Sequence, residues 1–199
     1  MSTATSPLKV VIVEDDAAIR LFLKETLEKN GYQVIGEAAT GTDMVRTVLA
    51  LEPDVVIFDI HLPHQDGLSA LRLIYQERIV AAVAITGDRD QELVKRAVDE
   101  HVLAYLVKPV EAHQLAPAIQ IAWNSFQQFR NISSENASLR QTLQNRKIIE
   151  RAKGILMKKY RWSEAEAFRR IQKGAMNRRM TMADLANGIL AGEEIDLSK

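Results

Sequence analysis

The chain has 199 residues, of which 47% are apolar and 26% charged, a composition that excludes disorder throughout and allows one large or two small domains. It contains no cysteine, which excludes disulfide frameworks, thiolate metal sites and cysteine nucleophiles, and its four histidines show no metal-ligand spacing. Because it lacks both a long apolar run and the pattern of a signal peptide, we expect a cytoplasmic protein with no membrane partner.

The net charge of zero conceals a division between two parts of the chain. Residues 1–138 contain 12 Lys and Arg against 19 Asp and Glu, whereas residues 139–199 contain 14 against 7. An acidic domain tends to hold cations, and a basic one attracts polyanions. We therefore expect two domains with different partners, the alternative being an ordinary fluctuation of charge along a chain.

Short apolar runs alternate with helical patterns in the first part of the chain. The predicted strands are Lys9–Val13, Val34–Ala38, Val55–Phe58, Val80–Ile85 and Ala104–Val107. The predicted helices are Ala17–Asn30, Thr42–Leu51, Leu68–Glu77, Gln91–Glu100 and one after Pro109. Strands that are apolar throughout are typical of a parallel sheet with helices on both faces, whose ligands bind at the C-terminal ends of the strands.

Several of these strand ends carry reactive side chains. They are Glu14, Asp15 and Asp16 after the first strand, Asp59 after the third, Thr86 at the end of the fourth, and Lys108 after the fifth, before a proline that could fix a cis bond. Gathered carboxylates repel one another unless a cation neutralises them, and hard oxygen ligands suit Mg²⁺. An acid to be modified, acids to hold a metal, and a hydroxyl and an ammonium to bind phosphoryl oxygens together indicate a phosphorylation site.

The ordered motifs VIVEDD, DVVIFDIHLPHQDG, AITG and YLVKP resemble the receiver domain of two-component response regulators over residues 8–123. The resemblance implies an α/β fold with a doubly wound, flavodoxin-like parallel sheet of five strands. It also implies that Asp59 accepts a phosphoryl group from a sensor histidine kinase. The alternative for Asp59 is an acid in a surface loop.

The same resemblance assigns roles to the other residues at the strand ends. The Mg²⁺ ligands that it implies are Glu14, Asp15, Asp59 and the carbonyl of His61. The phosphate-binding residues that it implies are Thr86 and Lys108, with Tyr105 as an aromatic switch. For Tyr105 the alternative is a half-buried strand residue.

A long linker helix is predicted over residues 113–143, because Pro117 is the only Gly or Pro between Pro109 and Gly154. Apolar residues recur at heptad-like spacing at Leu115, Ile119, Ala122, Phe126 and Phe129, slip at Ile132, and resume through Asn136, Leu139 and Leu143. This pattern predicts a coiled coil, with Asn136 buried to set its register, that makes the chain a dimer. The alternative is a helix that packs on its own domain.

The C-terminal part is predicted to hold three helices, the first continuous with the linker. The apolar face of the first helix comprises Ile148, Ile149, Ala152, Ile155, Leu156 and Tyr160. A capping box at Ser163-Glu-Ala-Glu166 opens the second, with Phe168, Ile171 and Ala175 facing inward. Thr181-Met-Ala-Asp184 opens a short third helix with Met182, Leu185, Ile189 and Leu190.

Basic side chains dominate this part, with twelve Lys and Arg against three Glu over residues 146–179. Lys147, Arg151 and Lys158 form one stripe along a helix, with Gly154 between them. Further basic residues are Arg169, Arg170, Lys173, Arg178 and Arg179. The imbalance favours a polyanion as partner, the alternative being a solvated face. Glycine in a helix costs about 1 kcal/mol relative to alanine, so Gly154 indicates close approach by another helix or a phosphate backbone.

The stretch over residues 139–190, with ERAKGILM followed by SEAEAF, resembles the ANTAR domain of AmiR/NasT-type transcription antiterminators, and we place the domain at residues 139–193. The resemblance implies an all-α domain that binds RNA, with a hairpin in an mRNA leader as target. Arg161 stands where that family usually has glycine, so we expect a different turn there. Trp162 and Phe168 could stack on RNA bases or pack in the core, and the core is favoured.

Together these features predict a response regulator, not an enzyme, that binds RNA hairpins, acts by antitermination and dimerises on phosphorylation. The alternative is a DNA-binding transcription factor with the same receiver. That function needs an exposed recognition helix, whereas the short third helix has the pattern of a buried one. A third alternative, a phosphotransfer or protein-interaction module, leaves the basic charge unexplained.

Overall fold

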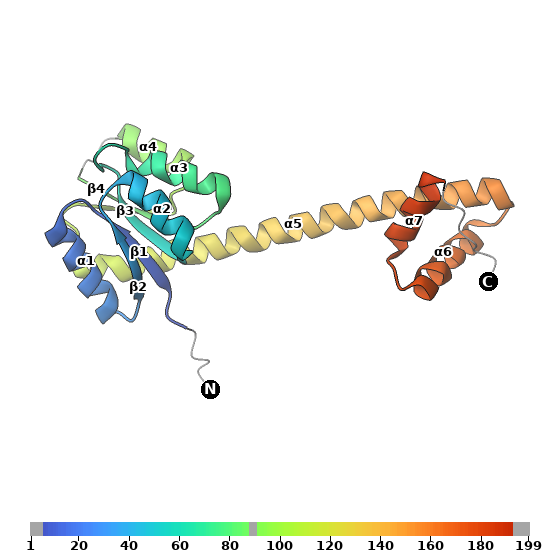
Figure 1. The fold of residues 1–199 in the computed structure, drawn as a ribbon, viewed down its shortest axis with the longest axis horizontal. Helices are drawn as coiled ribbons and strands as arrows, with labels where there is room; N and C mark the ends of the chain where they lie inside the picture. Colours follow the sequence, from blue (N-terminus) through green and yellow to red (C-terminus); the bar gives the residue numbers. More distant parts are fainter. Residues whose placement is uncertain (1–5, 88–90, 193–199) are drawn as a thin grey trace. The chain divides into compact units, whose positions relative to one another are not determined.

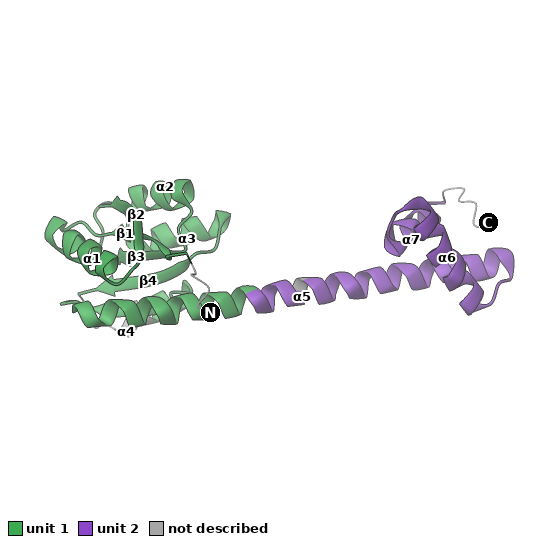
Figure 2. Cartoon of the chain, turned by 90° about the horizontal axis from the view of Figure 1, so that it is seen from below, with its two compact units in different colours: residues 1–130 green, residues 131–199 purple. Residues whose placement is uncertain are grey.

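The computed structural model describes residues 6–87 and 91–192, without the side chains of residues 91–94 and 137. In Figure 1, strands and helices alternate in the first part of the chain and only helices follow. The chain divides into two compact units, residues 1–130 (unit 1) and residues 131–199 (unit 2), which Figure 2 distinguishes by colour. Each unit has a hydrophobic core of its own.

Unit 1 is an α/β domain with one parallel sheet in the order β2-β1-β3-β4-β5. The strands are β1 (Lys9–Val13), β2 (Gln33–Ala38), β3 (Val55–Asp59), β4 (Ala81–Thr86) and β5 (Ala104–Val107). The helices are α1 (Ala17–Lys29), α2 (Gly41–Leu51), α3 (Gly67–Glu77), α4 (Gln91–Asp99) and the first part of α5 (Ala112–Tyr160). The predicted fold class is confirmed, and the predicted ends of these strands and of α1 to α4 differ from the observed ones by no more than one residue.

Two apolar layers cover the faces of this sheet. Val11 and Phe58 belong to the apolar layer on the side of α2, α3 and α4, whereas Ile12 and Ile57 belong to the layer on the side of α1 and α5. Figure 1 shows these two groups of helices on opposite faces of the sheet. All four side chains are fully buried. Because successive side chains of a strand alternate between the two faces, both faces demand apolar residues, which accounts for the uninterrupted apolar runs.

Polar residues fix where several helices begin and end. Asp16, Thr40 and Asp66 are the N-caps of α1, α2 and α3, and each accepts a hydrogen bond from a backbone N–H of the first turn. Asn30 ends α1, and Gly31 follows with φ of 84°, a conformation that glycine adopts without strain. The chain can therefore turn sharply into β2.

Helix α5 is continuous through Pro117, as predicted, but the first half of its apolar pattern has another explanation. Leu115, Ile119, Ala122 and Phe126 are buried in the core of unit 1, on the face of the sheet that α1 also covers. The prediction that these residues belong to a dimer seam is therefore wrong. A helix packed on a sheet requires the same spacing of apolar residues as a coiled coil.

The second half of the pattern is exposed. Phe129, Ile132, Leu139 and Leu143 are each more than half accessible. Asn136 is exposed too, and its side-chain amide donates a hydrogen bond to the carbonyl of Ile132 in the same helix. Association through α5 would therefore involve these later residues.

Unit 2 contains the rest of α5, α6 (Glu164–Arg178) and α7 (Met182–Ala191), so the predicted three-helix arrangement is confirmed. Its core is formed by Ala152, Leu156, Ala167, Ile171, Ala175, Leu185, Ala186 and Ile189. Thr181 and Asp184 form the reciprocal capping box at α7. At α6, Ser163 accepts from the backbone N–H of Glu166, whose carboxylate binds Arg170.

Some predictions for unit 2 need correction. Ile155, Tyr160 and Phe168 were expected to face the core, but they are 40%, 42% and 43% exposed. The charged Lys153 is buried instead. Arg161 has φ of 55°, in the left-handed region that glycine prefers, so the turn suited to glycine is kept and no different turn is needed.

Candidate functional site

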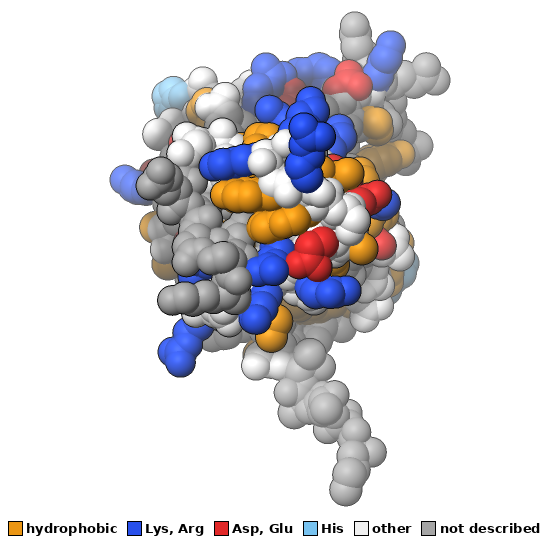
Figure 3. All heavy atoms as spheres, turned by 90° about the vertical axis from the view of Figure 1, so that its right-hand side faces the viewer, with side chains coloured by type: hydrophobic (Ala, Val, Ile, Leu, Met, Phe, Trp, Pro, Cys, Tyr) orange, Lys and Arg blue, Asp and Glu red, His pale blue; other side chains and the backbone are white. Residues whose placement is uncertain are grey.

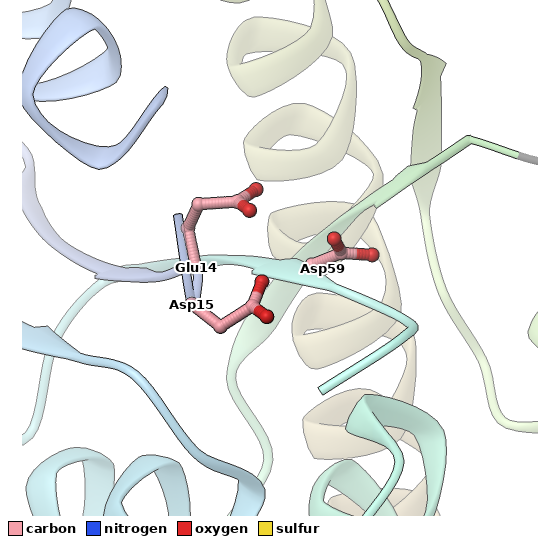
Figure 4. A group of neighbouring side chains, drawn as sticks. All are labelled: Glu14, Asp15 and Asp59. Carbon is pink, nitrogen blue, oxygen red and sulfur yellow. The ribbon is translucent and has the colours of Figure 1, made fainter. Parts of the chain in front are cut away.

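The predicted acidic cluster forms at the C-terminal edge of the sheet. Glu14 and Asp15 follow β1, Asp59 ends β3, and these two strands are neighbours. One carboxylate oxygen of each residue lies within 4.8 Å of the others, and Figure 4 shows the side chains of Glu14 and Asp15 extending toward Asp59. Glu14 and Asp59 are buried, whereas Asp15 is exposed. Asp16, which caps α1 through Ala18 and Ile19, is committed to that helix.

Lys108 joins the two buried carboxylates. Its Nζ lies 2.5 Å from Oδ2 of Asp59 and 2.9 Å from Oε1 of Glu14. Burial raises the pKa of Glu14, the charge of Asp59 raises it further, and the hydrogen bond from Lys108 opposes both effects. Burial lowers the pKa of Lys108, but the hydrogen bonds and the negative charges of Asp59 and Glu14 together outweigh burial, so the net shift is upward. One ammonium thus partly neutralises the cluster.

The donor set fits a divalent cation. Oε2 of Glu14 lies 2.9 Å from the Lys108 nitrogen at an angle that makes no hydrogen bond, and this buried oxygen has no other hydrogen-bond donor among the described residues. Together with the exposed carboxylate of Asp15 and the carboxylate of Asp59, it offers the hard oxygen ligands that Mg²⁺ prefers, with one side open to water. The backbone N–H of His61 donates to Oδ1 of Asp59 at 2.9 Å, and its imidazole is exposed. Its carbonyl as a ligand stays a prediction.

Thr86 and Tyr105 lie on the two strands beyond Asp59. Thr86 ends β4, directly after Ile85, which pairs with Asp59 across the sheet, and it is buried. Tyr105 lies on β5 and is 51% exposed, a value that fits both the aromatic switch and the half-buried strand residue of the alternative interpretation. Their roles in phosphate binding and switching stay predictions.

Two contributors to this site were not predicted. A Cβ atom at Gly67 would stand 2.3 Å from the carbonyl oxygen of Asp59, so only glycine fits there. Gly67 is the last residue of the motif HQDG, so the sequence contained this indication. Arg20 donates to the carbonyl of Glu14 at 2.6 Å, and an arginine one turn into a helix gave no such indication.

The predicted basic residues of unit 2 divide into two groups. Lys147, Arg151, Lys158, Lys173 and Arg179 are exposed, and no carboxylate of the described residues lies within 4.0 Å of their charged groups. In contrast, Arg169 and Arg170 bind Glu166 at 3.4 and 2.8 Å, and Arg178 donates to the carbonyl of Gly174. The first group is therefore the more available to a polyanion.

Gly154 lies among these exposed basic residues. A Cβ atom placed on it would meet no described heavy atom within 4 Å, outside its own helix and immediate neighbours. Packing against a helix of the same chain therefore does not explain this glycine. Approach by a phosphate backbone, or by a helix from outside this chain, stays a prediction for this glycine.

Sequence reasoning missed Lys153 altogether. Its ammonium is buried between α5 and α6, 2.8 Å from Oε2 of Glu150 and 2.8 Å from Oε1 of Glu164. This arrangement clamps the two helices together.

In the part of the chain that the structure describes, no helix has the length and hydropathy needed to span a bilayer.

Comparison with known proteins matches both units to families. The family model of the response regulator receiver domain matches residues 10–120, and the family model of the ANTAR domain matches residues 137–190. Both describe regulatory domains. The transcriptional regulatory protein PdtaR of Mycobacterium tuberculosis is 41% identical over 187 residues, which cover 94% of this chain and 91% of that protein.

Other relatives resemble the first unit alone. The chemotaxis protein CheY of Bacillus subtilis is 32% identical over 117 residues, 58% of this chain and 98% of that one. The solved signal receiver domain of an HD domain-containing protein from Pseudomonas fluorescens has a TM-score of 0.59 at 27% identity, and covers 66% of this chain and 97% of that one.

Proposed function

This chain belongs to the response regulators that join a receiver domain to an ANTAR domain, and from that membership we propose that phosphorylation of Asp59 controls its binding to RNA hairpins. A sensor histidine kinase is the phosphoryl donor. The outcome is transcription antitermination, and the chain needs no catalytic turnover of a substrate for it.

The geometry around Asp59 supports its role as phosphoacceptor. Both carboxylate oxygens are occupied, Oδ1 by the N–H of His61 and Oδ2 by the ammonium of Lys108. A new bond from either oxygen to phosphorus forms as the bond from phosphorus to the histidine nitrogen of the kinase breaks, and it displaces one of these donors. Lys108 and Thr86 are the side chains at this edge that would then bind phosphoryl oxygens. Glu14, Asp15, Asp59 and the carbonyl of His61 would hold Mg²⁺, which offsets the negative charge of the incoming phosphoryl group.

The observation that carries the RNA half of the proposal is the uncompensated charge of unit 2. Lys147, Arg151 and Lys158 lie on the face of α5 opposite the core residues Ala152 and Leu156, with Gly154 leaving room between them. Nucleic-acid backbones bind such stripes by charge and counterion release.

Association of two chains follows from the exposed apolar part of α5. Phe129, Ile132, Leu139 and Leu143 recur along one side of the helix in a pattern that a second copy can bury. Phosphorylation would shift the equilibrium toward this dimer. Two basic units in one dimer would then bind paired hairpins with avidity.

A DNA-binding role finds less support. A recognition helix must expose side chains that read base edges, but Leu185, Ala186 and Ile189 of α7 are buried in the core of unit 2. We therefore favour RNA as the nucleic acid.

The test compares three ligands over a range of salt concentrations: an RNA hairpin selected by the protein from a pool with one stem and randomised loops, its scrambled sequence, and the same sequence as duplex DNA. The hairpin should bind most tightly, and acetyl phosphate with Mg²⁺ should tighten its binding further. Asp59→Asn should show neither this gain nor a phosphoryl mass. Arg151→Gln should lower the salt slope by roughly 0.7–0.9. Equal or tighter binding to duplex DNA would favour the transcription factor instead.

A further inference from the structure

Two aromatic rings stack at the junction between α5 and α6. The ring centroids of Tyr160 and Trp162 are 4.5 Å apart, and their planes differ by only 18°. Tyr160 is the last residue of α5, and the left-handed conformation of Arg161 brings Trp162 back over it. Trp162 packs partly on the core of unit 2, whereas Tyr160 is 42% exposed. The stack thus has a buried side and an accessible one.

A cation lies over each ring of this stack, so a base that stacks on Tyr160 has to displace the mobile ammonium of Lys159 or share the ring with it. The Nζ atom of Lys159 lies 5.4 Å from the centroid of the Tyr160 ring, and the guanidinium carbon of Arg170 lies 5.3 Å from that of Trp162. The Glu166 carboxylate binds Arg170 at 2.8 Å, so it offsets part of that charge and holds the guanidinium in place. Figure 3 shows this end of unit 2, where hydrophobic side chains lie at the surface among Lys and Arg side chains.

We propose that the Tyr160–Trp162 stack is a platform for one unpaired base of the RNA. Bases stack on aromatic faces, and flanking Lys and Arg neutralise the adjacent phosphates, so the combination matches single-stranded nucleic acid. A purely apolar partner would cover the rings but would offer no opposite charge to Lys159, whose ammonium lies over Tyr160. The inference rests on the proposed RNA-binding function and adds the place where an unpaired base binds.

The platform is distinct from the stripe formed by Lys147, Arg151 and Lys158. Tyr160 follows Lys158 by two residues, which places it about 200° further round the helix, at the C-terminal end of α5. The stripe extends along about 17 Å of the helix before that end. A hairpin whose stem follows the stripe would therefore reach the rings only if its loop turns round the C-terminal end of the helix.

The test uses the full-length chain, the selected hairpin, and a blunt RNA duplex that has the same stem and no loop. Tyr160→Leu keeps apolar bulk but removes the aromatic face. It should weaken hairpin binding roughly tenfold, a loss within the range measured for base stacking, and leave both the duplex affinity and the salt slope unchanged. Tyr160→Phe should bind as wild type does. Replacing loop nucleotides one by one with abasic sites should identify one position whose loss is not additive with Tyr160→Leu.

Fluorescence gives a second readout that does not depend on that variant folding. The chain has two tryptophans, so Trp123→Phe leaves Trp162 as the only one. Its emission should be quenched by the hairpin and unchanged by the duplex. The proposal is overturned if the hairpin leaves this emission unchanged. It is also overturned if Tyr160→Leu folds and either leaves the affinities for the hairpin and the duplex unchanged or lowers both equally. Loss of self-association with unchanged hairpin binding would assign the rings to a second copy of the chain. A wild type that binds no hairpin would contradict the proposed function itself.

Discussion

The ammonium nitrogen of Lys108 lies 2.5 Å from Oδ2 of Asp59, although the two residues are 49 positions apart in the chain. The contact arises because β3 and β5 both end at the same edge of the sheet. Asp59 and Glu14 are buried carboxylates, and burying like charges together is costly unless a cation compensates them. Lys108 supplies that compensation from within the chain.

Replacing Lys108 should therefore make the fold depend on a divalent cation. Lys108→Ala leaves the carboxylates of Glu14, Asp15 and Asp59 without their ammonium, so its melting temperature in EDTA should fall below that of wild type. Mg²⁺ should raise the melting temperature of this variant more than that of wild type, because the cluster carries one more net negative charge. Thermal unfolding followed by circular dichroism measures both effects.

Lys24→Ala is the matched control, since Lys24 also forms an ion pair, with Glu37 at 2.8 Å, but on the exposed surface of α1. It should respond to Mg²⁺ as wild type does. An equal Mg²⁺ shift in wild type and Lys108→Ala would show that Lys108 does not compete with a cation at this site.

The acidic cluster could be predicted from the sequence because few arrangements satisfy strands that are apolar on both faces. A parallel sheet brings successive strand ends to one edge, so Glu14, Asp59 and Lys108 had to lie near one another. The bond from Arg20 to the carbonyl of Glu14 depends on how far α1 turns, which no local pattern encodes.

Helix α5 shows where periodicity stops being informative. Phe126 and Leu139 fit the same apolar pattern, yet one is buried in unit 1 and the other is exposed. Coiled coils and sheet-packed helices both need apolar residues at three- and four-residue spacing. The pattern therefore cannot distinguish a helix that packs on the sheet of its own domain from one that packs on a second helix. Likewise, Phe168 and Lys153 border the interface between α5 and α6, where the choice of the buried side chain depends on ion pairs rather than on hydropathy.

The exposed half of the α5 pattern predicts a dimer that one charge should disrupt. Leu143→Glu places a carboxylate among the exposed apolar residues of α5. Leu143 is 59% exposed in the single chain, so the fold should tolerate the change. After treatment with acetyl phosphate and Mg²⁺, wild type should sediment as a dimer and this variant as a monomer. Phe126 is unsuitable for the test because it is part of the core of unit 1.

Ser134→Glu provides the control for added charge. Ser134 is exposed and lies nine residues before Leu143, on the opposite side of α5. It should leave the dimer intact. If wild type and both variants sediment alike, whether monomeric or dimeric, then the exposed apolar residues of α5 are not the interface.

The clamp between α5 and α6 should make the stability of unit 2 depend on pH. The hydrogen bond from Lys153 holds the pKa of Glu164 below its ordinary value of 4.5. Its contribution is therefore present above pH 4.5 and is lost as the pH falls through the lowered pKa. Hydrogen bonds with Glu150 and Glu164 raise the pKa of Lys153 above 10.5, so the contribution persists until the pH rises through that raised value.

Urea unfolding of Glu164→Gln and its parent measures this effect, with Trp162 as the reporter in a Trp123→Phe background. The parent should be more stable at neutral pH, and the difference should vanish in acid, where Glu164 is protonated in both states. Added salt should reduce the difference, because Glu164 is largely exposed. A difference that is constant down to the lowest pH would mean that the charge of Glu164 contributes nothing.

Gly154 gives a prediction in which stability and function should change in opposite directions. Alanine is favoured over glycine within a helix by about 1 kcal/mol, and a Cβ at this position meets no described atom within 4 Å outside its own helix and immediate neighbours. Gly154→Ala should therefore raise the free energy of unfolding by up to that amount. If an RNA backbone follows Lys147, Arg151 and Lys158, the added methyl group stands where a phosphate approaches, so hairpin affinity should fall although the protein is more stable.

Urea unfolding and hairpin binding on the same preparation test both effects, with Arg151→Gln as the variant that should weaken binding without stabilising the fold. A more stable Gly154→Ala with unchanged hairpin affinity but impaired dimerisation would show that the glycine admits a second helix rather than RNA.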